Sequence, residues 1–126
     1  MIKYTRSDGA LDSGHVNVIS IVPYLVMKAA ALGRGKPKDA YDIYCVVDNF
    51  EGGIKGLTEE FLPYANKELI KDMCAKLNEK FETSNHAGPV DVVKFMGLTD
   101  EEEAKRIKQD IYQKIHYLVK SLIKDL

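Results

Sequence analysis

Apolar residues recur at three- and four-residue steps through most of the sequence after residue 21, in segments that glycine or proline separates. Such spacing places the apolar side chains along one face of a helix. Pro23, Pro37 and Pro89 suit a first helical position, and Gly33 and Gly97 follow the ends of two segments. The helices that this pattern predicts cover residues 23–32, 37–50, 59–65, 67–82, 89–96 and 100–124.

Side-chain caps are predicted at three of these helices. Thr58 and Asn66 precede the third and fourth segments and can accept hydrogen bonds from the first free N–H groups. Thr99 and Glu102 have the spacing of a capping box at the start of the last helix. The predicted apolar faces contain Leu69, Met73 and Leu77 beside Ile70, Cys74 and Phe81 in the fourth helix, and Ile107, Ile111, Ile115, Leu118 and Leu122 in the last.

The first 21 residues have a different pattern. Apolar and polar side chains alternate over 2–6 and again over 15–19, where Val16 and Val18 share one face, and the turn formers SDGALDSG lie between. We therefore predict a β-hairpin over residues 1–21, which must pack on helices because two strands alone are marginal in water. The predicted fold class is α+β and mainly helical. It is a single domain over 1–126, with the hairpin followed by five or six helices in 22–126.

Composition limits the function classes. The 126 residues suffice for one domain, and 18 basic against 19 acidic residues exclude the strongly basic face of a dedicated nucleic-acid-binding domain. Cys45 and Cys74 lack a CxxC spacing, and the three histidines lie at no metal-ligand spacing, so no metal site is predicted. No apolar run has the length of a signal peptide or a membrane span, which predicts a cytoplasmic protein without membrane contact.

Lys28 is the most informative charged residue, because it interrupts an otherwise apolar helix and must reach solvent or an anionic partner. Asp39 and Asp42 are three residues apart and share a face of the next helix. A short basic loop joins the two helices, so they should pack antiparallel. We predict that Lys28 lies within about 4 Å of at least one of these carboxylates. The group could hold nucleotide phosphates and a divalent cation, or it could be a structural ion pair.

The residues of this region carry a family resemblance. The run MKAAALGRGKPKDAYDIYCVV resembles a segment of the AbiEii-type nucleotidyltransferases, which are relatives of DNA polymerase β and the toxins of some toxin–antitoxin pairs. The matching features are Lys28 in an apolar helix, Arg34 in a basic loop, and the Lys38-Asp39 and Tyr41-Asp42 pairs. VNVISIVPYLVMK is similar to the strand that feeds this helix, and VVKFMGLTDEEEAKRIKQDIYQKI resembles the family's helical C-terminal half.

The resemblance implies that Lys28 and Arg34 contact the phosphates of an NTP. It implies that Asp39 and Asp42 are the catalytic-site acids, one of which orients the attacking group or the lysine. In a complete enzyme, Mg²⁺ would assist transfer of a nucleotidyl group to a protein or to a nucleic acid such as tRNA, and an antitoxin would be a partner. However, no Gly-Ser and Asp-x-[Asp/Glu] motif precedes Lys28. The chain therefore resembles only the C-terminal half of such an enzyme, and we expect it to be inactive without the missing catalytic segment.

The alternative is a catalytically inert helical module for binding or assembly. A hairpin without sheet neighbours would leave an unpaired strand edge, and the helix over 23–32 would leave an uncovered apolar face. Both features favour a two-fold homodimer. If the C-terminal helices cover the hairpin instead, the protein is a monomer, and light scattering after size-exclusion chromatography distinguishes the two states.

Overall fold

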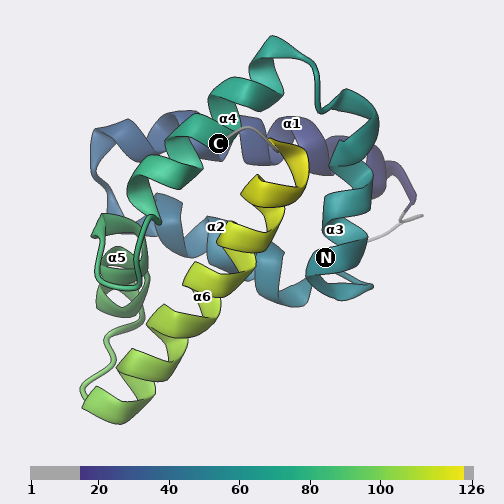
Figure 1. Cartoon of the computed structure of the whole chain (residues 1–126). Helices are drawn as coiled ribbons and strands as arrows, with labels where there is room; N and C mark the ends of the chain where they lie inside the picture. The colour runs from purple at the N-terminus through teal and green to yellow at the C-terminus, as the bar shows by residue number, and fades with distance from the viewer. Residues whose placement is uncertain (1–14, 124–126) are drawn as a thin grey trace.

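The structure is a computed structural model that describes residues 15–123, with side chains described from residue 21 onward (Figure 1). All regular elements in this range are helical. They are α1 (His15–Ala31), the 3₁₀ helix η1 (Leu32–Arg34), α2 (Pro37–Asn49), α3 (Gly53–Phe61), the 3₁₀ helix η2 (Leu62–Tyr64), α4 (Glu68–Lys80), α5 (Ala87–Met96) and α6 (Glu101–Leu122).

The predicted β-hairpin is wrong where the structure can test it, and the α+β class is replaced by an all-helical one for residues 15–123. The second predicted strand, residues 15–19, forms the start of α1, while the first, residues 2–6, lies outside the described residues. A short run rich in valine and isoleucine does not distinguish a strand from an apolar helix. Inside a helix its backbone groups bond to one another, whereas a strand needs a partner. Pro23 consequently lies inside α1, not at its first turn.

Three predicted caps also differ from the structure. Thr58 lies within α3, where its hydroxyl donates to the Ile54 carbonyl oxygen at 2.7 Å. Asn66 is replaced by Lys67 as the N-cap of α4, without a side-chain hydrogen bond. The N-cap of α6 is Asp100, whose carboxylate accepts a 3.0 Å hydrogen bond from the Glu102 N–H. At α6, threonine and aspartate are both good capping residues, so the adjacent candidates Thr99 and Asp100 shift the predicted boundary by one residue. The third helix, predicted over 59–65, instead starts six residues earlier, at Gly53.

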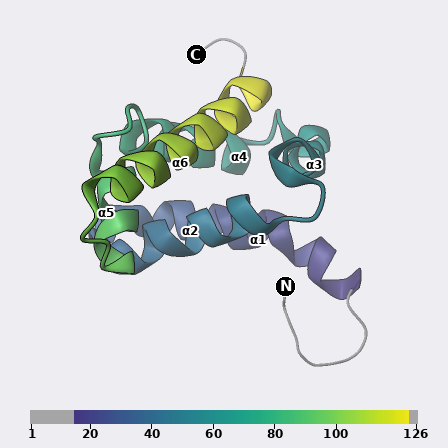
Figure 2. The ribbon, with the colours of Figure 1, turned by 90° about the horizontal axis from the view of Figure 1, so that it is seen from below.

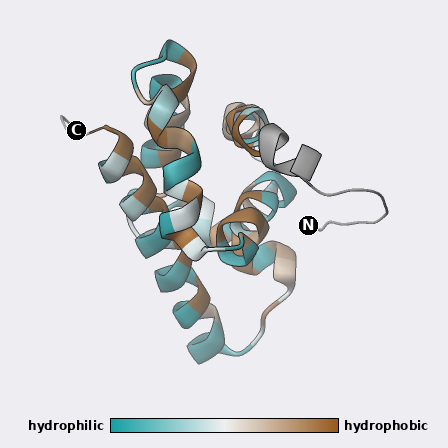
Figure 3. Ribbon diagram, turned by 90° about the vertical axis from the view of Figure 1, so that its right-hand side faces the viewer, coloured by the Kyte–Doolittle hydropathy of each residue, from teal (hydrophilic) through white to brown (hydrophobic). Residues whose placement is uncertain are grey.

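The helices form two layers. Figure 2 shows α1 and α2 in one layer and α4 and α6 in the other, with α3 and α5 at opposite ends. The helix contacts agree, since α1 packs on α2 and α4, while α6 packs on α2, α3, α4 and α5. Hydrophobic and hydrophilic residues alternate along the ribbons in Figure 3, as expected for helices that each bury one face.

Helix α6 supplies much of the core between these layers. Its predicted apolar face is confirmed, because all five predicted residues are buried. The predicted face of α4 is confirmed except at Leu69, which is 66% exposed while its neighbour Ile70 is buried. The largest fully buried side chains are those of Phe61, Leu25, Ile43, Leu57, Met73, Leu77, Ile111, Ile115, Leu118, Val47, Val92 and Val119.

Two further observations concern the cysteines and membrane spans. Cys74 is a buried free thiol, and burial raises its pKa to about 11, so the thiol stays protonated and unreactive at neutral pH. Cys45 is also free and is half-buried. Among the helices that the structure describes, none combines the length and the apolar character needed to cross a membrane.

Candidate functional site

The α1–α2 corner brings Lys28, Asp39 and Asp42 together. The Lys28 ammonium nitrogen lies 2.8 Å from Asp42 Oδ2 and 3.4 Å from Asp39 Oδ1. The predicted approach of Lys28 to these carboxylates is therefore confirmed. Helix α1 ends at Ala31, η1 reverses the chain, and α2 starts at Pro37, so the last turn of α1 lies beside the first two turns of α2.

Two more cations complete this group. Arg34 Nη2 lies 3.3 Å from Asp39 Oδ2, and Lys38 Nζ lies 2.9 Å from Asp42 Oδ2. We call these five residues the ion cluster. Each carboxylate contacts two cations, and the cluster has one more cation than carboxylates. It therefore has a net positive charge, although the protein as a whole does not.

The side chains of the ion cluster differ in their exposure to solvent. Asp39 is only 4% exposed, the Lys28 side chain is 17% exposed, and the outer cations Arg34 and Lys38 are largely exposed. A buried carboxylate is costly unless a cation and hydrogen bonds compensate it. Lys28 and Arg34 provide this compensation for Asp39. The cluster thus compensates the buried Asp39 charge and links α1 to α2.

Lys28 and Asp42 each stabilise the charged form of the other. The hydrogen bond to Asp42 raises the pKa of Lys28 above its ordinary value, against the opposing effect of partial burial. Partial burial alone would raise the pKa of Asp42, but hydrogen bonds from Lys28 and Lys38 outweigh it and hold that pKa below its ordinary value. Both shifts favour the charged forms of Lys28 and Asp42 at neutral pH.

The outer cations retain donor capacity for an anion. An ammonium group has three N–H donors and a guanidinium has five. Lys38 uses one donor and Arg34 uses one, while Lys28 uses two. An anion with several oxygens, such as a phosphate chain, can accept the remaining donors without displacing the carboxylates.

Aromatic side chains border the ion cluster. The sequence pattern singled out Tyr41 among them, but not Tyr24 or Phe95. The Lys28 ammonium lies 5.8 Å from the centre of the Tyr24 ring, one turn earlier on α1. Burial and the Asp42 charge raise the pKa of the Tyr24 hydroxyl. The Tyr41 ring lies beside that of Phe95 on α5, with a centroid distance of 4.9 Å. Four-residue spacing could have indicated Tyr24, but no sequence signal places Phe95 here.

A second polar cluster joins α2 to α6 and was also missed. Lys114 Nζ lies 2.8 Å from Asp48 Oδ1 and 3.1 Å from Asp110 Oδ2, and the Tyr44 hydroxyl donates to Asp110 at 3.1 Å. These four residues line an open hollow along the two helices. Lys114 thus repeats the arrangement of Lys28, a lysine shared by two carboxylates.

The part of the chain that the structure describes contains no ready set of metal ligands. No group of three or more histidine, cysteine, aspartate or glutamate side chains is placed to hold an ion there. Asp39 and Asp42 already contact cations, so neither is available as an unpaired ligand. Comparison of the chain with protein-family models, with curated proteins and with solved structures finds no match.

Proposed function

We propose that the chain is the helical, nucleotide-binding part of an AbiEii-type nucleotidyltransferase, with the ion cluster as its phosphate-binding site. The observation that carries this proposal is the convergence of Lys28, Arg34 and Lys38 on one helix corner with an excess of positive charge. Nucleotidyl transfer depends mainly on charge neutralisation and in-line positioning. The three cations, which Asp39 and Asp42 hold in place, would neutralise part of the charge of a triphosphate.

In this proposal the chain is inactive by itself. Mg²⁺ and its carboxylate ligands would belong to a catalytic segment elsewhere in a longer protein or on another chain. The acceptor, a tRNA-like nucleic acid or a protein, and an antitoxin partner follow only from the family resemblance. One part of that resemblance is lost, because the expected strand of the VNVISIVPYLVMK segment is helical from residue 15.

A second candidate function is an inert helical assembly module. Leu62, Tyr64 and Leu69, near the junction of α3 and α4, are all exposed large apolar side chains, as in a protein-contact surface. The strand edge that first suggested a homodimer does not exist among residues 15–123, so within that range self-association would have to use helical surfaces. This function requires no nucleotide binding, which provides the discriminating measurement.

Replacing Lys28 with methionine should weaken ATP binding to the 126-residue chain by about tenfold, because a hydrogen bond to a charged group contributes about 1.5–3 kcal/mol. Isothermal titration calorimetry measures this effect. Lys114→Met is the matched control, since it also removes a lysine shared by two carboxylates, and it should leave ATP affinity unchanged. Equal losses in both variants, or no ATP binding by the wild-type chain, would contradict the proposed phosphate site.

The isolated chain should produce no metal-dependent transfer product. Incubation with labelled NTPs, Mg²⁺ and bulk tRNA tests this, because two carboxylates already paired with cations do not replace a metal-binding pair. A labelled product that Lys28→Ala abolishes would show instead that this chain contains a complete active site.

A further inference from the structure

An exposed aromatic surface adjoins the ion cluster. Tyr41 of α2 and Phe95 of α5 lie with their ring centroids 4.9 Å apart and their planes tilted by 35°. Helices α2 and α5 pack closely, which fixes the relative position of the two rings. Phe95 is nevertheless 46% exposed, so part of its ring is open to a ligand.

The aromatic pair and the cations belong to one continuous surface. Lys38, Tyr41, Asp42 and Cys45 follow at the three- and four-residue spacing of one helix face. Tyr41 also directly precedes Asp42, a member of the ion cluster, in the chain. The cationic end at Lys38 and the aromatic end at Tyr41 are therefore separated by about one helical turn, roughly 5 Å along α2.

A nucleotide has the same two ends, a planar base and an anionic phosphate chain. Aromatic side chains bind bases by stacking, which tolerates any base because every base has a π face. We propose that Phe95, supported by Tyr41, forms the base-binding subsite of the nucleotide whose phosphates lie on the ion cluster. This inference rests on the proposed function and adds the ring that holds the base.

The test compares ATP with tripolyphosphate, which has the phosphate chain without the base. Isothermal titration calorimetry gives both affinities for the 126-residue chain. In Phe95→Leu, the ratio of ATP affinity to tripolyphosphate affinity should fall about tenfold, because stacking on a ring is lost. Tripolyphosphate affinity itself should stay unchanged, and Phe95→Tyr, which keeps the ring, should retain the wild-type ratio.

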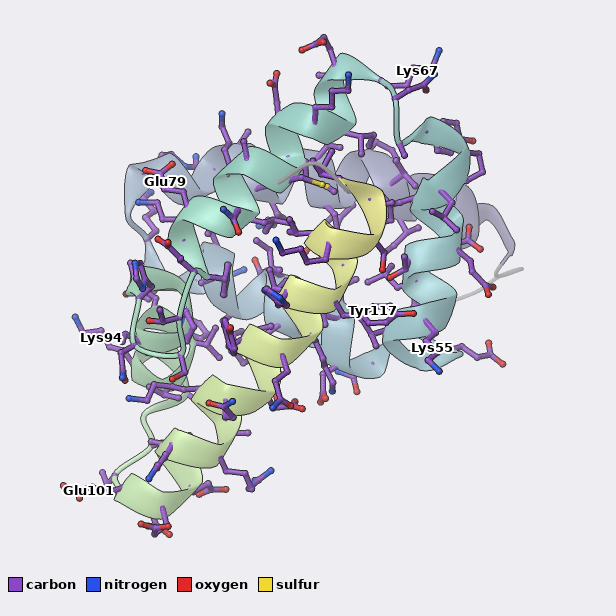
Figure 4. All side chains as sticks on the ribbon, viewed as in Figure 1. Lys55, Lys67, Glu79, Lys94, Glu101 and Tyr117 are labelled. Atoms are coloured by element: carbon purple, nitrogen blue, oxygen red, sulfur yellow. The ribbon has the colours of Figure 1, made fainter. Side chains whose placement is uncertain are left out.

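Tyr117→Leu is the control, because Tyr117 is also an exposed aromatic residue but belongs to α6. In Figure 4 it lies far across the molecule from Lys94, the neighbour of Phe95 in sequence. This variant should keep the wild-type ratio. If the ratio in Phe95→Leu equals that of the wild type while both probes bind, the base subsite is wrong and the phosphate site stands. If neither probe binds the wild-type chain, both proposals are wrong.

Discussion

Replacing Gly88 with alanine is expected to lower the free energy of unfolding by about 2 kcal/mol. A Cβ atom at this position of α5 would lie 2.5–2.6 Å from three atoms of the Phe81 ring. Phe81 is only 2% exposed, so neighbouring side chains confine the ring. Overpacking of a core costs about 1–3 kcal/mol. The better helix propensity of alanine offsets up to about 1 kcal/mol of this cost.

Urea denaturation followed by circular dichroism measures this loss. Gly33→Ala is the matched control, because a Cβ atom there meets no other atom within 4 Å. That control should change the free energy of unfolding by no more than about 0.5 kcal/mol. Equal stability of the two variants would show that the Phe81 ring has space to move and that the α4–α5 contact is looser than described.

Replacing Pro23 with alanine should have the opposite effect and raise the free energy of unfolding by about 2 kcal/mol. Pro23 is an exposed residue inside α1. It has no N–H to donate to the carbonyl of Ile19, and its ring crowds that carbonyl, at a cost of about 3 kcal/mol relative to alanine. Proline offsets up to about 1 kcal/mol of this cost, because its ring restricts the conformations of the unfolded chain.

The same denaturation experiment tests whether α1 extends before Pro23. If the helix started at Pro23, the residue would occupy a favourable first position and alanine would bring no gain. Pro37 occupies such a position in α2, so Pro37→Ala is the internal control and should not be stabilising. A Pro23→Ala variant that behaves like Pro37→Ala would restore the boundary that the sequence pattern predicts.

Local signals placed α2 and α4 within two residues of their observed bounds, but they predicted the third helix over 59–65, whereas α3 spans Gly53–Phe61. The prediction of a helix over 37–50 differs from α2 by one residue, and 67–82 differs from α4 by one residue at its start and two at its end. The signals failed over residues 15–22, where five of the eight residues are valine or isoleucine and their spacing fits either structure. There the choice depends on the presence of a partner strand, which the local sequence does not encode.

One contact of the candidate site was predictable from local sequence, and another was not. The contact of Lys28 with Asp39 and Asp42 was predictable because a short loop forces two consecutive helices to lie side by side. The position of Phe95 was not, because it depends on how α5, more than forty residues later, packs on α2. Tertiary packing, and not local sequence, therefore decides which aromatic residues lie near the ion cluster.

The ion cluster has one more consequence, which concerns the direction of the chain. Lys28 lies in the last turn of α1 and Asp39 in the first turn of α2. The carbonyl end of a helix is partially negative and its N–H end partially positive, so each residue suits the helix that carries it. Exchanging Lys28 and Asp39 would preserve their mutual attraction. However, each side chain would then carry the same sign of charge as the helix end at which it lies. The polarity of the chain therefore favours the order base then acid at this corner, by up to about 1 kcal/mol for each charge.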